Sequence, residues 1–266
     1  MSGAIGVFDS GVGGLSVLRH IRENLPHERL IYVADSGHVP YGDKSAAFIE
    51  TRSLAITRFL ISQGADAIVI ACNTATGAAA HSLRAKFKGI PILGMEPAVK
   101  PAVTATNSGV VGVLATVGTL ESARFAALLE KYAGQRIKIE TQGCPGLVEQ
   151  VEKGELYSAQ TRELIERYTA ELIKRGADTL ILGCTHYPFL AALIREVVGE
   201  NVTLVDTGAA VARHLQHRVE AELPPRITGE GSEEFYTSGN VDQAARIMSK
   251  LWGKEIIAWR LPAEFS

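Results

Sequence analysis

The sequence repeats itself, and each copy carries a cysteine at the same place. Residues 64–72 read Gly-Ala-Asp-Ala-Ile-Val-Ile-Ala-Cys and residues 176–184 read Gly-Ala-Asp-Thr-Leu-Ile-Leu-Gly-Cys, an offset of 112. Residues 6–10 match residues 112–116, and residues 93–95 match residues 204–206 more weakly. Three matches in the same order predict an internal duplication. Shared apolar patterning would explain the similar strands, but it does not explain a cysteine after each of them.

Short apolar runs alternate with longer segments of helical spacing along the chain. We expect strands at 4–8, 30–34, 67–71, 110–114, 137–141 and 179–182, and helices at 15–25, 45–63, 122–132 and 158–175. Continuous apolar strands separated by helices predict an α/β fold with mostly parallel sheets covered on both faces. Together with the duplication, this pattern predicts two pseudo-symmetric lobes, each a mostly parallel sheet flanked by helices.

The duplicated part ends near Asp206, and the segment after it is too short to build its own core. This segment is expected to contain helices at 209–221 and 241–251, a strand at 235–237 and a Pro-Pro break at 224–225. We therefore expect a first lobe from residues 1–97 plus 209–266 and a second lobe from residues 98–208. The active site is expected in the cleft between them.

Charge and composition exclude several classes of protein. The 266 residues carry a formal net charge of −2, without the basic excess that indicates a nucleic-acid or anionic-membrane partner. No apolar run reaches the roughly 18 residues that span a bilayer, and the first ten residues lack the positive start of a signal peptide. Three cysteines do not make a disulfide framework. We expect a cytoplasmic protein with free thiols.

Cys72 and Cys184 both follow the carboxyl end of a predicted strand, where parallel sheets bind ligands. Each precedes small polar residues and a predicted helix, whose N-terminus would favour the thiolate. One such cysteine is more often a small buried hydrophobe. Two cysteines related by duplication would instead approach a shared cleft from opposite sides. One thiolate could then remove a proton from a tetrahedral carbon while the other thiol protonates its opposite face.

Other polar residues lie near the same strand ends. His186 could exchange protons with Cys184 or orient it, or it could be a capping or core histidine. Asp9 could cap the helix that begins near Gly14, although the Gly-rich loop after it favours a place in the cleft. Four further residues occupy equivalent strand ends and could either bind carboxylates or cap helices: Asn73, Thr74, Thr116 and Thr185.

These motifs resemble those of the glutamate racemases, within the aspartate/glutamate racemase superfamily. The matching segments span nearly the whole chain, and the two cysteine motifs in this order are highly specific. The segments are Phe-Asp-Ser-Gly-Val-Gly-Gly at 8–14, Asp35-Ser36 with Pro40-Tyr41-Gly42, Ala-Cys-Asn-Thr-Ala at 71–75, Cys144-Pro145, and Gly-Cys-Thr-His-Tyr-Pro at 183–188.

The resemblance implies a two-base interconversion of L- and D-glutamate that needs no pyridoxal phosphate, other cofactor or metal. It implies that Cys72 acts on the D-enantiomer with help from Asp9, and that Cys184 acts on the L-enantiomer with help from His186. A further catalytic glutamate falls at Glu152, with Glu149 as the alternative. The implied substrate-binding residues are Ser10, Pro40, Tyr41, Gly42, Asn73, Thr74, Thr116 and Thr185.

The resemblance also implies a biological setting. Members of the family supply D-glutamate for peptidoglycan, and they are often homodimers, so a homodimer is one expected assembly. Cys144 has no counterpart in the duplication and is not one of the two bases in the family, so we expect it to be structural.

Other functions remain open on the residues alone. An aspartate or other amino-acid racemase is the nearest alternative, because pocket length is a three-dimensional property. A nucleotide-binding oxidoreductase is suggested by Gly-Val-Gly-Gly-Leu-Ser at 11–16, although Ser16 replaces the third glycine of that fingerprint. A Cys/His hydrolase built on Cys184 would leave Cys72 idle. A two-lobed amino-acid-binding protein would have no use for two thiols.

Overall fold

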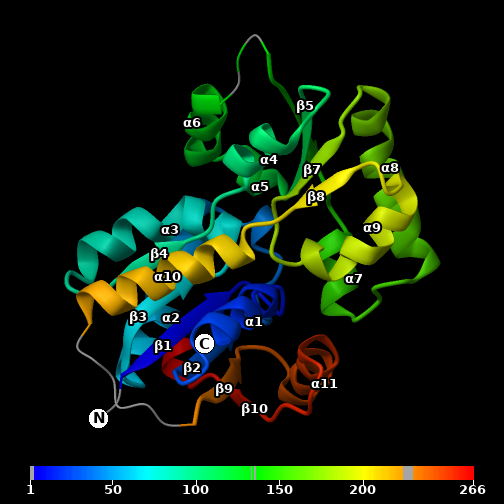
Figure 1. Cartoon of the computed structure of the whole chain (residues 1–266). Coiled ribbons are helices and arrows are strands. Elements are labelled where there is room, and N and C mark those ends of the chain that lie inside the picture. Colours follow the sequence, from blue (N-terminus) through cyan, green and yellow to red (C-terminus); the bar gives the residue numbers. More distant parts are fainter. Residues whose placement is uncertain (1–2, 133, 135, 224–229) are drawn as a thin grey trace.

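Two parallel sheets lie next to each other in the molecule (Figure 1). The computed structural model describes residues 3–132, 134, 136–223 and 230–266, so the expected Pro-Pro break at 224–225 lies outside the described residues. The six-stranded sheet has the order β10-β9-β2-β1-β3-β4, and the four-stranded sheet has the order β6-β5-β7-β8. We call each sheet with its flanking helices the first lobe and the second lobe.

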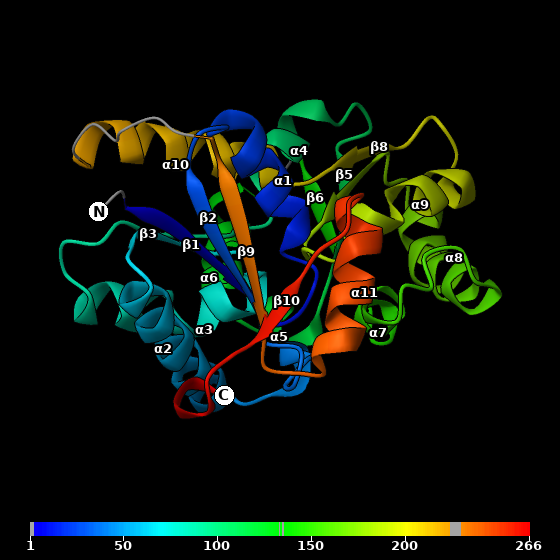
Figure 2. The same cartoon turned by 90° about the horizontal axis from the view of Figure 1, so that it is seen from below.

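The first lobe contains both the start and the end of the chain. Its strands are β1 (Ala4–Asp9), β2 (Arg29–Ala34), β3 (Ala65–Ile70), β4 (Ile92–Gly94), β9 (Ser232–Thr237) and β10 (Ala258–Arg260). Its helices are α1 (Leu15–Asn24), α2 (Ala46–Ser62), α3 (Asn73–Lys86), α10 (Gly208–Glu222) and α11 (Val241–Trp252), with the short 3-10 helices η1 (Tyr41–Asp43) and η3 (Ala263–Phe265). Figure 2 shows β9 and β10 continuing this sheet beyond β2.

Strand β1 is apolar throughout because helices cover both faces of its sheet. Ile5 and Val7 pack into a core that includes α1 and α10, while Ala4 and Phe8 pack into a second core with α2 and α3. Alternate residues of a strand point to opposite faces, so each face needs its own apolar set. The uninterrupted apolar run that predicted a parallel strand is the direct result.

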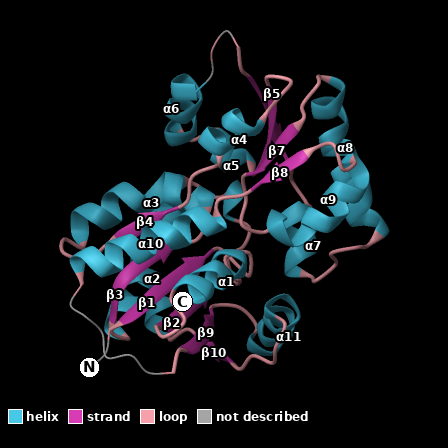
Figure 3. Ribbon diagram, in the orientation of Figure 1, coloured by secondary structure: helices cyan, strands magenta, loops and turns pink. Residues whose placement is uncertain are grey.

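The second lobe repeats this arrangement on a smaller scale (Figure 3). Its strands are β5 (Val110–Ala115), β6 (Lys138–Gly143), β7 (Thr179–Leu182) and β8 (Thr203–Val205). Its helices are α4 (Val99–Ala105), α5 (Val117–Leu120), α6 (Ala123–Tyr132), α7 (Leu147–Glu152), α8 (Ala159–Lys174) and α9 (Ala191–Val198), with the 3-10 helix η2 (Tyr187–Leu190). Helices α4 and α6 cover one face, and α8 and α9 cover the other.

The strand orders confirm the predicted α/β fold with a duplicated core. The order β2-β1-β3-β4 of the first lobe repeats as β6-β5-β7-β8 in the second, with parallel pairing throughout both sets. Cys72 follows β3 and Cys184 follows β7, so both cysteines follow the same strand of the repeat. In the described part of the chain, no helix has the length and apolar character needed to cross a membrane.

One expected element differs from the prediction. We expected Cys184, like Cys72, to lie at the N-terminus of a helix that follows small polar residues, but residues 187–190 form η2 and α9 begins only at Ala191. In an α-helix capped by Cys184, residue 188 would have to donate its N–H to the Cys184 carbonyl, and Pro188 has no N–H. Tyr187 donates to that carbonyl instead, at 3.0 Å.

Candidate active site

The two cysteines line one cavity between the carboxyl ends of the two sheets. It contains all eight residues that the sequence indicated for substrate binding, together with both cysteines and His186. The full lining is Ser10, Pro40, Tyr41, Gly42, Cys72, Asn73, Thr74, Thr116, Thr119, Val148, Cys184, Thr185 and His186. The cavity volume is only about 10 Å³, whereas small-molecule sites have volumes of about 300 Å³ or more. A ligand therefore needs more room than the structure provides at this place.

Cys72 is the N-cap residue of α3. Its Sγ accepts a hydrogen bond from the Ala75 N–H at 3.4 Å and lies 3.8 Å from the Ser10 hydroxyl. Burial raises the pKa of the Cys72 thiol, the charge of Asp9 raises it further, and the Ala75 N–H lowers it only in part. The helix N-terminus favours the thiolate, as expected, but burial outweighs this contribution and the net pKa of Cys72 is raised.

Cys184 lies next to a buried histidine–glutamate pair. Its Sγ is 3.7 Å from His186 Nδ1, and His186 Nε2 is 2.7 Å from Glu152 Oε1. Burial alone would lower the pKa of His186, but its hydrogen bonds to Cys184 and Glu152 raise that pKa well above the usual value. Of the two glutamates left open by the sequence, Glu152, at the end of α7, is the one that contacts His186.

Asp9 is fully buried and is not among the residues that line the cavity. Its Oδ2 accepts hydrogen bonds from the N–H groups of Gly11 and Gly14 at 3.1 and 3.2 Å, in the loop that leads into α1. Its Oδ1 accepts a hydrogen bond from the Thr185 hydroxyl of the second lobe. Burial raises the pKa of Asp9 to about 6, although the charge of His186 opposes the rise. Asp9 acts on Cys72 through its charge, since its hydrogen bonds go to the loop and to Thr185.

The glycines after Asp9 allow the loop to lie against the second lobe. A Cβ on Gly11 would lie 1.9 Å from Glu152 Oε1, and one on Gly13 would lie 2.2 Å from His186 Nδ1. The Val12 N–H donates to Glu152 Oε1 at 2.7 Å. In a dinucleotide fingerprint these N–H groups would bind phosphate. Here carboxylates of the protein accept from them, so the oxidoreductase interpretation is not favoured.

Three threonine hydroxyls join the two lobes inside the cavity. Thr74 Oγ1 lies 2.9 Å from Thr116 Oγ1 and 3.1 Å from Thr119 Oγ1. The sequence analysis did not identify Thr119 or Val148. The signal for Thr119 is its spacing, because Thr116 caps α5 and the N–H of Thr119 is its partner. Asn73 Oδ1 is buried and has no partner among the described residues, which leaves an acceptor for a ligand.

A buried ionic network holds the wall formed by residues 40–42. The Asp35 carboxylate accepts two hydrogen bonds from Arg52, at 3.0 and 2.8 Å, and one from the Tyr41 hydroxyl at 2.5 Å. Burial alone would raise the pKa of Asp35, but these hydrogen bonds hold it below its usual value. Gly42 lies close to the second lobe, since a Cβ there would be 3.0 Å from Thr116 Cβ.

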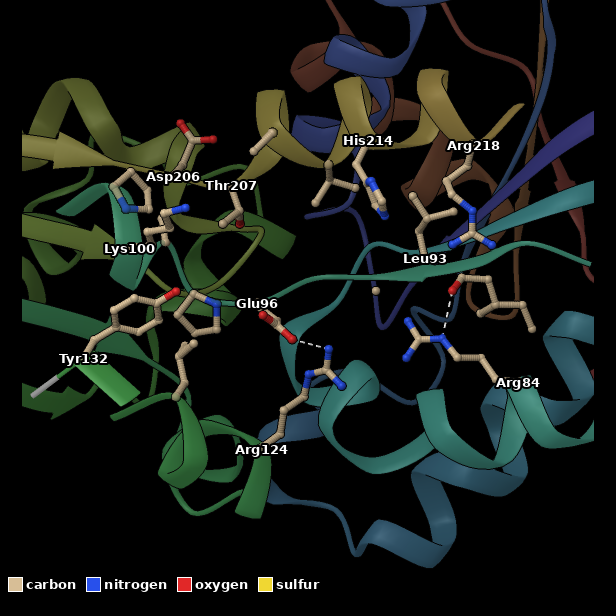
Figure 4. A pocket seen from close by; sticks show the side chains of 18 residues that line it. Arg84, Leu93, Glu96, Lys100, Arg124, Tyr132, Asp206, Thr207, His214 and Arg218 are labelled. Carbon is tan, nitrogen blue, oxygen red and sulfur yellow. Dashed lines mark hydrogen bonds and ion pairs between the residues drawn. The ribbon is translucent and has the colours of Figure 1, made fainter. Parts of the chain in front are cut away.

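Cys144 lies outside this cavity. Its thiol donates to the Gln142 carbonyl at 3.3 Å, and burial raises its pKa to about 12. A larger cavity of about 470 Å³ lies where the chain passes between the lobes, after β4 and after β8 (Figure 4). Arg84, Arg124 and Arg218 line it, and neither Cys72 nor Cys184 does.

Two cysteines from duplicated α/β lobes line one cavity, and the comparisons with known proteins identify the chain as a racemase. The chain belongs to the Asp/Glu/Hydantoin racemase family, whose model matches residues 5–215. It is 56% identical to the glutamate racemase of Methylococcus capsulatus over 263 residues, which covers 98% of this chain and 96% of the relative.

Solved structures agree with this assignment. The crystal structure of glutamate racemase isoform RacE1 from Bacillus anthracis matches with a TM-score of 0.89 and 31% identity, covering 98% of both chains. Escherichia coli glutamate racemase in complex with L-glutamate and the activator UDP-MurNAc-ala matches with a TM-score of 0.87 and 33% identity, again covering 98% of both chains.

Proposed function

We propose that this protein interconverts L- and D-glutamate by proton transfer at Cα between two thiols. The observation that carries the proposal is that Cys72 and Cys184, one from each copy of the repeat, line the same cavity. Inversion at a tetrahedral carbon needs one base on each face, and two equivalent strand ends supply them. The high identity to a glutamate racemase over nearly the full chain supports glutamate as the substrate.

The reaction follows from the placement of these groups. The Cys184 thiolate removes the α-proton of L-glutamate, and the Cys72 thiol donates a proton to the opposite face to give D-glutamate. The reverse direction exchanges the two roles. His186 and Glu152 hold the proton on the Cys184 side, and the charge of Asp9 acts on the Cys72 side.

The polar lining is suited to the two carboxylates of the substrate. Hydroxyl and amide donors that converge on the cavity can stabilise negative charge as it develops on the α-carboxylate. The donors are Ser10, Asn73, Thr74, Thr116 and Thr185, while Pro40, Tyr41 and Gly42 form the opposite wall.

The setting of this reaction is part of the proposal. The D-glutamate would serve peptidoglycan synthesis in the cytoplasm, with a homodimer as one assembly. We also propose residues 1–97 plus 209–266 and residues 98–208 as the two domains, which places the cavity lining on both sides of their boundary.

Proton NMR in D₂O tests the proposal directly. Purified protein is mixed separately with L- and D-glutamate, without added cofactor, while optical rotation is recorded. We expect the α-proton signal to disappear and the rotation to decay to zero from either side. Absence of exchange with both enantiomers would remove glutamate as the substrate, and the same test with aspartate would then distinguish a sister racemase from a binding protein.

A further inference from the structure

A two-thiol racemase must restore its own protonation state after each turnover, and this inference rests on the function proposed above. Conversion of L- to D-glutamate leaves the proton on Cys184 and removes one from Cys72. Before another L-glutamate can react, Cys184 must lose its proton and Cys72 must regain one. Both sulfurs are buried, at 8% and 5% exposure, so these protons need a route to solvent.

A continuous chain of titratable groups leads away from Cys184. Its Sγ lies 3.7 Å from His186 Nδ1, and His186 Nε2 lies 2.7 Å from Glu152 Oε1. Both hydrogen bonds of the Glu152 carboxylate, from His186 and from the Val12 N–H, use Oε1. The second oxygen, Oε2, therefore remains available to a water molecule.

Glu152 also lines a second cavity, which shares no lining residue with the cavity of the two cysteines. This cavity has a volume of about 110 Å³, and its other lining residues are Val12, Ser36, Val39, Asn240, Gln243, Ala244 and Ile247. About 10–15 Å³ suffices for one water molecule, so several fit. Asn240 and Gln243 are exposed, so the cavity extends from Glu152 toward solvent.

Ser36 gives independent support for water in this cavity. Its Oγ is buried and has no hydrogen-bond partner among the described residues. Buried hydroxyl groups are normally satisfied, by protein or by ordered water. A water molecule next to Ser36 would satisfy this oxygen and would lie in the same cavity as the Glu152 carboxylate.

We propose that His186, Glu152 and this 110 Å³ cavity form a proton exit for Cys184 that is separate from the substrate cavity. Protonation of Cys184 removes its charge, which is one of the interactions that raise the pKa of His186, and the neutral imidazole then carries its proton on Nε2. The Cys184 S–H bond breaks as His186 Nδ1 takes the proton. His186 Nε2 gives its own proton to Glu152, and Glu152 gives one to water in the cavity, which leaves the thiolate, a neutral imidazole with its proton on Nδ1, and the carboxylate. Exchange of this imidazole proton from Nδ1 to Nε2 before the next turnover restores the starting tautomer. The same steps in reverse reload Cys184 after conversion of D- to L-glutamate.

Cys72 has no such chain in the part of the molecule that the structure describes. Its sulfur has the Ser10 hydroxyl and the Ala75 N–H as hydrogen-bond partners, and neither titrates near neutral pH. Cys72 therefore exchanges its proton through the substrate cavity. The two thiols are equivalent in the repeat, but they reach solvent by different routes.

Filling the cavity tests the exit without touching the reacting groups. Ala244→Leu, on α11, adds an apolar side chain to the cavity, and Ala245→Leu makes the same change on the same helix outside the lining. The step that restores the starting protonation state enters kcat, whereas kcat/KM for the first turnover does not contain it. We expect Ala244→Leu to lower kcat by about tenfold or more and to leave kcat/KM within about twofold, with Ala245→Leu like the wild type.

A second variant guards against misfolding of the first. Ser36→Val removes the unpaired hydroxyl and should lower kcat in the same selective way. Equal losses in kcat and kcat/KM in both variants would overturn the exit, because they would place the damage in the chemical step. Wild-type kinetics in both variants, with the Leu side chain seen in the cavity by crystallography, would overturn it as well. Failure of the wild type to racemise glutamate would instead refute the proposed function.

Discussion

The Thr185 hydroxyl donates a hydrogen bond to Asp9 Oδ1 at 3.2 Å, which links the end of β1 in the first lobe to the segment after β7 in the second lobe. Thr185 directly follows Cys184. Asp9 ends β1, which pairs with β3, the strand before Cys72. Asp9 is fully buried, and its pKa is raised to about 6. The link between the lobes is therefore made to a carboxylate that changes its charge close to neutral pH.

The raised pKa of Asp9 predicts a pH dependence of stability. Between its ordinary pKa of 3.8 and about 6, Asp9 binds more protons in the folded than in the unfolded state. Its contribution to the free energy of unfolding therefore falls as the pH rises through this window, by up to about 3 kcal/mol. Asp9→Asn removes this dependence, so the variant should gain stability relative to wild type from pH 4 to pH 7.

Urea unfolding of both proteins at several pH values between 4 and 7 measures this difference. A gap between the two free energies that stays constant with pH would contradict the assigned pKa.

Cys72 and Cys184 should both be needed for racemisation. Each should be dispensable for exchange of the α-proton of the enantiomer on which the other cysteine acts. Cys184→Ser leaves Cys72 able to remove and return the α-proton of D-glutamate, so deuterium should enter D-glutamate without loss of rotation. Cys72→Ser should do the same with L-glutamate. Racemisation should fall at least about 100-fold in both variants. Cys144→Ser is the matched control, since Cys144 is buried outside the cavity, and it should retain activity.

Arg52 should be essential for stability because it neutralises a buried carboxylate. Arg52→Met leaves the Asp35 carboxylate, at 0% exposure, without its guanidinium partner and should cost about 3–5 kcal/mol of unfolding free energy. Arg58→Met, on the exposed side of the same helix α2, should change stability by less than about 0.5 kcal/mol. Urea denaturation gives both values. Where Arg52→Met still folds, KM should rise, because Arg52 no longer holds the Asp35 carboxylate that accepts from Tyr41 in the cavity wall.

Gly13 should tolerate no side chain, because it lies against His186 of the opposite lobe. Gly13→Ala would place a Cβ 2.2 Å from His186 Nδ1 and displace the ring from Cys184. A displacement of about 1 Å at such a group costs about 100-fold in rate, so kcat/KM should fall by this order. Gly134→Ala is the comparison, since a Cβ there meets no described atom within 4 Å. Normal activity in Gly13→Ala would show that the ring position is not critical.

The repeat made most of the fold predictable. The expected strands at 30–34 and 179–182 and the helix at 45–63 lie within two residues of β2, β7 and α2. Strand β10 was not predicted, because its three residues carry little periodicity and two of them are exposed. The start of the helix after Cys184 was misplaced. Pro188 prevents a helix from starting at Cys184 only because residue 188 would have to donate its N–H to the Cys184 carbonyl, and the sequence analysis did not consider this hydrogen bond.

The candidate site was predictable where a residue follows a matched strand, as Cys72 and Cys184 do. Thr119 and Val148 were missed because their positions depend on how α5 and α7 pack against the opposite lobe. The Glu152–His186 contact joins residues 34 positions apart, so sequence alone left Glu149 and Glu152 open. Burial also raises the pKa of the Cys72 thiol, whereas the sequence predicted that the thiolate is favoured. Local sequence contains no measure of desolvation.

The sheet order has a consequence for how the chain folds during synthesis. Strands β5, β6, β7 and β8 occupy one continuous stretch, so the ribosome releases the second sheet as a complete unit. The first sheet has to wait, because β2 pairs with β9, about two hundred residues further along. Until the last segment emerges, β2 is an unprotected sheet edge, which is where aggregation begins. Truncation of the chain before β9 would therefore be more harmful to solubility than the small size of the missing segment suggests.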